Sequence, residues 1–258
     1  MTVARILIIA GSDSGGGAGI QADIKTVTLL GGHAMTAVTA LTAQNTLGVT
    51  AVHAVPAEMV IAQIDAVASD IGVDAVKIGM IGSAATVEAV ADRLDAPDLA
   101  QVPVVFDPVM IATSGSRLAD EATIAAFGRL LRRATVSTPN LDELAALAGQ
   151  SLASVTDVDA AAASLMAQGA GAILATGARF GGELEDRLYA ATSCNWRSKR
   201  IDTIHDHGTG CTLASGIATG LAQGMPLSDA IARARDFVRK ALLAAPGFGA
   251  GHGPMGFI

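Results

Sequence analysis

The sequence predicts an α/β fold, a three-layer αβα sandwich built around a mainly parallel central sheet. Short apolar runs recur along the 258 residues, each followed by Gly, Pro or Asn and then by a helix-like stretch. Hydrophobic residues make up 51% of the chain and aromatic residues only 3%, so the core must be filled by Ala, Val, Ile and Leu, as in helices laid on parallel strands. No repeat, low-complexity tract or linker marks a boundary, and residues 1–258 are expected to form a single domain.

The expected strands are the short apolar runs at residues 4–10, 75–78, 102–106, 135–137 and 172–175. The first runs straight into a cluster of glycines, which favours a strand over a piece of buried helix. Residues 31–55 are rich in Thr and Val with little helical periodicity, so paired strands at an edge of the sheet are expected there. Residues 183–201 are expected to add a second, irregular hairpin.

Helices are expected where apolar residues recur at helical spacing. One follows Pro56, with Glu58 in its first turn, where a negative charge suits the helix dipole. Another carries an apolar stripe near the end of the sequence, formed by Leu227, Ile231, Ala234, Val238 and Ala241. Because strands alternate with helices, parallel strands joined by right-handed crossovers are the economical arrangement.

Composition narrows the class of function. The net charge is −7 and no basic block occurs, so the attraction that dominates nucleic-acid binding has no source and nucleic acid is not expected as a partner. The two cysteines, Cys194 and Cys211, have no zinc-site or disulfide-framework spacing, which fits a reducing cytoplasm. Neither a signal peptide nor an apolar run of roughly eighteen residues is present, so no membrane association is expected.

Residues 10–20 form a glycine cluster between the first strand and a helix-like stretch at 21–30. Glycine lets a backbone approach a ligand closely, because no β-carbon intervenes. The cluster lacks the Gly-Lys-Ser/Thr ending of a Walker A loop, and no acidic residue stands between Asp23 and Glu58 to hold a dinucleotide ribose. A ligand-binding loop and a plain flexible turn both remain open.

Residues 207–216 form a second glycine-containing segment, at the start of another helix-like run. Backbone N–H groups at Gly208, Thr209 and Gly210 would form an anion hole, where the helix dipole stabilises a transferring phosphoryl group. Cys211 would lie in the first turn, where the dipole lowers a thiol pKa. The alternative is that Cys211 is a small buried hydrophobic residue.

Two further strand ends carry polar residues. Asn140 and Glu143 have the spacing of a helix cap and capping box, and the same spacing would also let them organise Mg²⁺ and its waters. Asp107 ends another strand, at the carboxyl edge where open α/β sheets bind ligands. These segments therefore point to one rim of the sheet.

The combined motifs resemble the bacterial hydroxymethylpyrimidine/phosphomethylpyrimidine kinases of thiamine biosynthesis. The resemblance covers essentially the whole chain, with matching order and approximate spacing at residues 11–26, 40–46, 77–80, 107–110, 138–143, 207–212 and 251–256. It implies a ribokinase-like fold, a homodimer, and ATP- and Mg²⁺-dependent phosphorylation of 4-amino-5-hydroxymethyl-2-methylpyrimidine and of its monophosphate.

The resemblance also implies roles for individual residues. The pyrimidine would contact Gly11, Asp23, Gln44, Met80 and Val109. An amide such as that of Gln44 can both donate to a ring nitrogen and accept from an exocyclic amine. Cys211 would be the base for the substrate hydroxyl, and the backbone from Gly208 to Cys211 would form the anion hole. The ATP and Mg²⁺ end would comprise Asp107, Asn140, Glu143, Thr176, Gly177 and Arg179.

The sequence departs from the family pattern at two positions. Many members carry a phosphate-contacting Lys where this chain has Thr176, and a second Lys where it has Ala112. Loss of a phosphate contact is costly in a reaction that depends on positioning and electrostatics, and Arg179 is the candidate replacement. The two absent lysines leave a non-catalytic pyrimidine-binding protein as one alternative function. A pyridoxal kinase is the other, because a pyridine that bears a hydroxymethyl group makes similar demands on a site.

Overall fold

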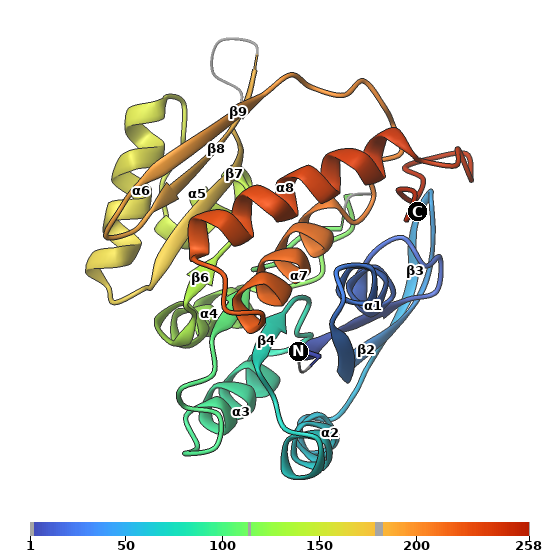
Figure 1. Cartoon of the computed structure of the whole chain (residues 1–258), viewed down its shortest axis with the longest axis vertical. Helices are drawn as coiled ribbons and strands as arrows, with labels where there is room; N and C mark the ends of the chain where they lie inside the picture. Colours follow the sequence, from blue (N-terminus) through green and yellow to red (C-terminus); the bar gives the residue numbers. More distant parts are fainter. Residues whose placement is uncertain (1–2, 113–114, 179–182, 258) are drawn as a thin grey trace.

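The computed structural model describes residues 3–112, 115–178 and 183–257. Its strands are β1 (Arg5–Asp13), β2 (His33–Asn45), β3 (Gly48–Ala54), β4 (Ala75–Ile78), β5 (Val104–Phe106), β6 (Val136–Ser137), β7 (Ala172–Ala178), β8 (Leu184–Tyr189) and β9 (Cys194–Ser198). Within these ranges they form one nine-stranded sheet in the order β3-β2-β1-β4-β5-β6-β7-β8-β9 (Figure 1). The pairs from β2 to β7 are parallel, whereas β3, β8 and β9 pair antiparallel with their neighbours. The prediction of a mainly parallel sheet is confirmed.

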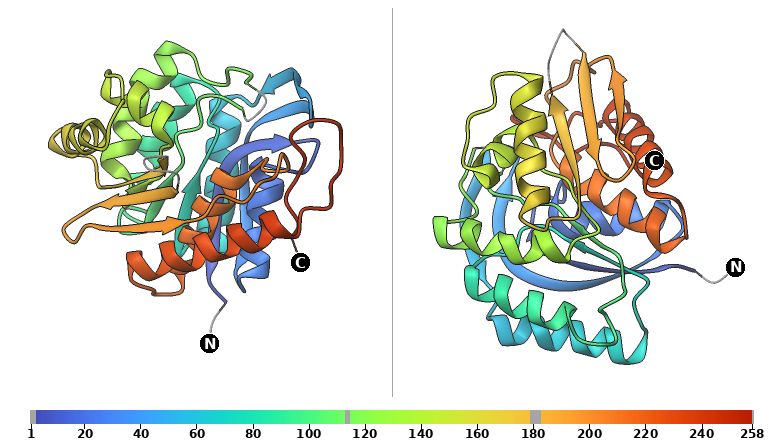
Figure 2. Two further views of the ribbon diagram at one scale, coloured as in Figure 1. Left: turned by 90° about the horizontal axis from the view of Figure 1, so that it is seen from above. Right: turned by 90° about the vertical axis from the view of Figure 1, so that its left-hand side faces the viewer.

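Helices cover both faces of this sheet (Figures 1 and 2). They are α1 (Gly19–Leu29), α2 (Ala57–Asp70), α3 (Ala84–Leu94), α4 (Glu121–Arg133), α5 (Leu141–Ala148), α6 (Val155–Ala167), α7 (Thr209–Ala222) and α8 (Leu227–Leu243). On β1, Ile6 and Ile8 face the core under α1, α7 and α8, while Leu7 and Ile9 face the core under α2 to α6. Because successive residues of a strand point to opposite faces, one apolar strand supplies both cores. The three-layer sandwich is confirmed.

The structure contains the predicted strands and helices, but their first and last residues differ from the prediction. The structure confirms all five predicted strands, and both predicted helices, α2 and α8, follow a proline that occupies the N-cap. Strand β1 is longer than predicted and continues to Asp13, into the glycine cluster. The two segments expected to pair at the sheet margins form the hairpin ends β2–β3 and β8–β9. Among the described residues, no helix is both long enough and apolar enough to cross a bilayer.

Helices α7 and α8 pack at very close range. A β-carbon on Gly216 would lie 2.8 Å from Ala234 Cβ, and one on Gly220 would lie 2.6 Å from Ala230 Cβ. The two glycines are four residues apart and so share one face of α7. This contact fixes the position of α7 against the covering helix, and with it the position of the first turn of α7.

Candidate active site

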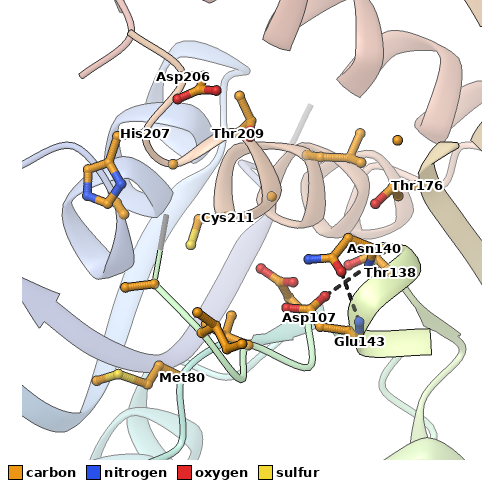
Figure 3. Close-up of a pocket in the computed structure, with 18 of the residues that line it drawn as sticks. Met80, Asp107, Thr138, Asn140, Glu143, Thr176, Asp206, His207, Thr209 and Cys211 are labelled. Carbon is orange, nitrogen blue, oxygen red and sulfur yellow. Dashed lines mark hydrogen bonds between the residues drawn. The ribbon is translucent and has the colours of Figure 1, made fainter. Parts of the chain in front are cut away.

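A cavity of about 940 Å³ opens at the carboxyl edge of the parallel strands. Its walls come from the ends of β1, β2 and β7, from the segments that follow β4, β5 and β6, and from the start of α7. The predicted site residues that line it are Gly11, Gln44, Met80, Asp107, Val109, Asn140, Glu143, Thr176, Gly177, Gly208, Thr209, Gly210 and Cys211. In Figure 3, Cys211 lies between His207 and Met80 on one side and Asp107, Asn140 and Glu143 on the other.

Two predicted site residues are not in this lining. Arg179 lies outside the described residues. Asp23 is fully buried beneath the cavity, where its carboxylate accepts from Lys77 Nζ at 2.8 Å and from Ser215 Oγ at 2.7 Å. The structure therefore does not bring the Asp23 side chain to the cavity lining, because its carboxylate is bound to Lys77 on β4 and to Ser215 on α7.

The partner of Asp23, Lys77, is a fully buried lysine in the centre of the sheet. Burial opposes its charged form, but Asp23, Cys211 and Asp107 together raise the pKa of Lys77 above its usual value. Burial raises the pKa of Asp23, and Lys77 and Ser215 oppose that shift. Both carboxylate oxygens have a donor, so the pair is an ionised one in which a positive and a negative charge are buried together.

The first turn of α7 is open toward the cavity. Its N-cap is Gly208, whose φ of 88° suits glycine, and a β-carbon there would overlap the carbonyl oxygen of Gly17. No side chain caps this helix and no acidic residue lies in its first turn. Thr209 N donates to Asp206 O at 3.4 Å, outside the helix. The N–H groups of Gly210 and Cys211 have no partner within the helix, so they and the dipole are available to an anion.

Cys211 projects from this turn into the cavity, but it is not a preformed thiolate. Burial raises the pKa of its thiol to about 12. The charge on Lys77 and the Gly19 N–H act to lower this pKa, while Asp23 and Asp107 act to raise it. The expectation that the helix dipole makes the thiol acidic was wrong for this state of the protein, because burial and two carboxylates outweigh it.

Asp107 and Glu143 form a pair of buried carboxylates across from Cys211. Burial raises the pKa of Asp107 to about 6, although Lys77 opposes the shift. Burial and the neighbouring Asp107 raise the pKa of Glu143 to about 8. Asp107 Oδ2 is buried and has no hydrogen-bond partner among the described residues. Two carboxylates in this condition favour a nearby cation.

Two carboxylates suit Mg²⁺, which needs few protein ligands, better than a metal ion whose ligands all come from protein side chains. The described part of the chain has no cluster of three or more His, Cys, Asp or Glu side chains able to hold a metal. Mg²⁺ typically binds through one or two carboxylates, with water and substrate phosphates completing its shell. Asp107 and Glu143 match that requirement.

Glu143 also completes the predicted capping box. Its Oε2 accepts from Asn140 N at 2.9 Å, and Asn140 Oδ1 accepts from Glu143 N at 2.9 Å (Figure 3). The cap therefore exists and still presents both side chains to the cavity. The two interpretations of this motif are compatible.

The far wall of the cavity carries the residues predicted for ATP. Thr176 N donates to Pro139 O at 2.9 Å, which ties β7 to the segment before Asn140. Gly177 N donates to Asp186 Oδ1 at 2.8 Å, and Arg235 Nε donates to Asp186 Oδ2 at 2.6 Å. Arg235 thus reaches the cavity from α8, on the same wall as Thr176.

Sequence reasoning missed several residues of this site. Lys77 carried a signal, since a charge inside a four-residue apolar strand must be paired when the strand is buried. Asp13 and His207 belonged to motifs that were recognised, but neither received a role. Arg235 gave no signal, because it lies off the apolar stripe of its helix, where a charged residue is usually exposed to solvent.

An uncapped helix start faces two buried carboxylates across a deep cavity at the carboxyl edge of a parallel sheet. Fold and site together define a kinase of the α/β class that phosphorylates a small molecule.

Comparison with known proteins specifies the family. The family model for phosphomethylpyrimidine kinase matches residues 13–256. The hydroxymethylpyrimidine/phosphomethylpyrimidine kinase of Streptomyces coelicolor is 46% identical over 257 residues, which cover 99% of this chain and 94% of that protein. This chain belongs to the phosphomethylpyrimidine kinase family.

Solved structures agree with this assignment. The phosphomethylpyrimidine kinase of Clostridium difficile superposes with a TM-score of 0.81 at 33% identity, covering 92% of this chain and 99% of that one. The pyridoxal kinase of Staphylococcus aureus, in complex with AMP-PCP and pyridoxal, gives a TM-score of 0.90 at 30% identity, covering 100% of this chain and 94% of that one. The predicted ribokinase-like kinase fold is confirmed.

Proposed function

We propose that this protein transfers the γ-phosphoryl group of ATP to 4-amino-5-hydroxymethyl-2-methylpyrimidine, and then to its monophosphate, with Mg²⁺ as cofactor. The observation that carries the proposal is that Cys211 and the open first turn of α7 share one cavity with Gln44 and with the Asp107–Glu143 pair. A candidate base for the substrate hydroxyl, an anion hole and a cation site are therefore found in one cavity.

The pyrimidine end is formed by Gly11, Gln44, Met80 and Val109. Gly11 is buried, and a β-carbon there would overlap the end of the Met80 side chain. The Met80 side chain therefore packs directly onto the Gly11 backbone, and the two contribute an apolar part of the cavity lining that also includes the Gln44 amide. A small aromatic ring with polar ring atoms suits an apolar wall that carries one amide.

The phosphate end is formed by the start of α7 and by Asn140 and Thr176. Mg²⁺ bound by Asp107 and Glu143 would supply positive charge to phosphate oxygens. The N–H groups at Gly210 and Cys211 would stabilise the charge that develops on the transferring group. Among the described residues, Arg200, Arg235 and Arg239 also line the cavity. Positively charged side chains are therefore present although Thr176 replaces the Lys that many family members carry.

Cys211 is proposed as the group that accepts the hydroxyl proton. Phosphoryl transfer passes through a loose transition state, so this proton need leave only late in the reaction. The thiol must first lose its own proton, which Asp107 and Asp23 oppose through their charge. Neutralisation of Asp107 would lower the thiol pKa, so the cation site and the base are coupled electrostatically.

We further propose a homodimer that acts in the cytoplasm. Both cysteines are free. Strand β3 leaves an unpaired, exposed edge at one end of the sheet, and Leu41 and Val52 are about half exposed on that hairpin. Such edges are usually covered. Sedimentation of the wild type and of Val52→Lys would test this, and a wild-type monomer would contradict it.

The experiment for the activity is coupled ADP release with Mg-ATP and the hydroxymethylpyrimidine, with pyridoxal in parallel and mass spectrometry of products. We expect pyrimidine-dependent release with mono- and diphosphate products. Cys211→Ser should retain pyrimidine binding and lose most turnover, whereas the matched control Cys194→Ser should keep it. Pyrimidine binding without ADP release would overturn the proposal in favour of a non-catalytic binding protein, and preferential turnover of pyridoxal would favour a pyridoxal kinase.

A further inference from the structure

The side chain of Gln44 enters the cavity from a backbone that is held on both sides. Ser14 Oγ donates to Gln44 O at 2.8 Å and accepts from Gln44 N at 2.8 Å. The glycine cluster that carries Ser14 therefore fixes where this side chain starts. What Gln44 offers to a ligand then depends on which way its carboxamide faces.

Asp13 determines which neighbouring atoms carry hydrogens, because both of its carboxylate oxygens only accept hydrogen bonds. Its Oδ1 accepts from Gly15 N at 2.8 Å, and its Oδ2 accepts from Gly17 N at 3.0 Å and Ala18 N at 2.8 Å. Burial acts to raise the pKa of Asp13, but hydrogen bonds from His207, Ala18 and Gly15 hold it below its usual value. Asp13 is therefore an ionised carboxylate, which has no proton to donate.

His207 lies between Asp13 and Gln44. Its Nε2 is 3.1 Å from Asp13 Oδ2, so this nitrogen must carry the hydrogen of that contact. The same Nε2 is 2.9 Å from Gln44 Nε2, an arrangement that would bring two donors together. A half-turn of the carboxamide exchanges its N and O without changing its shape. The Gln44 oxygen then accepts from His207, and one N–H is shared by two acceptors.

The other end of the carboxamide leads to the same orientation. Thr42 Oγ1 lies 3.0 Å from Ser12 O, which can only accept, so the hydroxyl hydrogen of Thr42 goes there. The same Oγ1 is 3.3 Å from the second polar atom of the Gln44 amide. After the half-turn, that atom is the amide nitrogen and donates to the hydroxyl oxygen. Every donor then has an acceptor.

The His207 ring is itself immobilised. Its side chain is only 10% exposed, and a β-carbon on Gly17 would lie 2.6 Å from its Cδ2. Its backbone N donates to Gly253 O at 3.2 Å. A packed ring with one determined proton position is a rigid reference for a neighbouring amide.

We propose that His207, held by Asp13, is a positioning residue that determines substrate specificity by locking the Gln44 carboxamide with its oxygen toward His207 and its nitrogen toward Thr42. This inference rests on the proposed function. An amide has two hydrogens and two oxygen lone pairs, so one of each remains for a ligand, in a fixed order.

A fixed order distinguishes two rings of nearly identical shape. A 4-aminopyrimidine presents an acceptor ring nitrogen beside an amine donor, whereas its 4-oxo analogue presents a ring N–H donor beside a carbonyl acceptor. Turning the oxo ring over to match the locked amide would carry its hydroxymethyl group away from Cys211. A free amide would instead rotate and accept either ring.

The test is the ratio of kcat/KM for the 4-amino alcohol to that for its 4-oxo analogue, measured for the wild type, His207→Leu and His252→Leu. His252 is the matched control, because it too is paired with an aspartate, Asp206, at 2.8 Å. The wild-type ratio should be on the order of 100, since a site built to bond a polar group rejects its mismatch. In His207→Leu it should fall at least about tenfold, mainly through KM, and in the control it should not change.

The ratio is independent of how much of a preparation is folded, because both substrates meet the same active fraction. If His207→Leu has no activity with either alcohol, Gln44→Glu decides, since an acceptor-only side chain should shift preference toward the oxo analogue. An unchanged ratio in His207→Leu, or in Gln44→Glu where that variant decides, overturns the inference. A wild type that fails to phosphorylate the amino alcohol at all would instead refute the proposed function.

Discussion

Replacing Lys77 by Met should cost about 3–5 kcal/mol of unfolding free energy, the range for removing one partner of a buried ion pair. The structure supports the full range, because Lys77 and Asp23 both have 0% exposed side chains and their charged atoms are 2.8 Å apart. Met fills a similar volume, so the loss comes from the unpaired carboxylate and not from a cavity. For a chain of this size, the melting temperature should fall by about 6–20 °C.

The same variant should acquire a new pH dependence. Burial already raises the pKa of Asp23, and the loss of Lys77 removes the largest opposing influence. A carboxyl whose folded-state pKa is raised favours folding fully below its unfolded value of about 3.9 and loses that contribution as pH rises through the folded pKa. The stability deficit of Lys77→Met relative to the wild type should therefore grow as the pH rises above about 4 and level off once the pH exceeds the raised folded-state pKa of Asp23.

Urea unfolding followed by circular dichroism at several pH values provides the measurement. The double variant Lys77→Met/Asp23→Asn removes both charges and should recover most of the loss and abolish the added pH dependence. Lys240→Met, on the exposed side of α8, should change stability by no more than about 0.5 kcal/mol. A double variant less stable than Lys77→Met would refute this account of the pair.

Three further outcomes follow from the site geometry. Asn140→Ala removes the capping side chain and should lower stability by about 1 kcal/mol in denaturant unfolding, in contrast to no change if the cap were incidental. Gly208→Ala forces a β-carbon onto the Gly17 carbonyl at a positive φ and should abolish turnover while pyrimidine binding by calorimetry persists; normal turnover would show that the first turn of α7 is not the anion hole. Because burial raises the pKa of Cys211 to about 12, its alkylation by iodoacetamide should be slow at pH 8 and accelerate about tenfold per pH unit above it; peptide mapping that shows fast labelling at pH 8 would contradict this.

The regular part of the fold could be predicted from the sequence because it depends on local periodicity. The apolar run in β1 and the stripe of α8 show their burial directly in residue spacing. The carboxyl rim of the sheet was also predictable, since Asp107 and Asn140 follow strands that must be parallel.

The environment of individual side chains could not be predicted in the same way. Asp23 follows the glycine cluster closely and so looked like part of a ligand loop, but its partner Lys77 is 54 residues away on another strand. The helix position of Cys211 was predicted, but its pKa depends on charges from β4, α1 and the end of β5. The partner of a buried charge and the pKa of a buried thiol depend on tertiary packing, which a single sequence does not reveal.

The glycine contact between α7 and α8 has a consequence for genetic screens. Substitution of Gly216 or Gly220 by a larger residue would push α7 away from α8, and the helix moves as a rigid rod. Its first turn, with Gly210 and Cys211, would shift relative to Asp107. In a screen for loss of activity, substitutions at these two core positions would therefore inactivate the protein as substitutions of substrate-contacting residues do, although neither glycine lines the cavity.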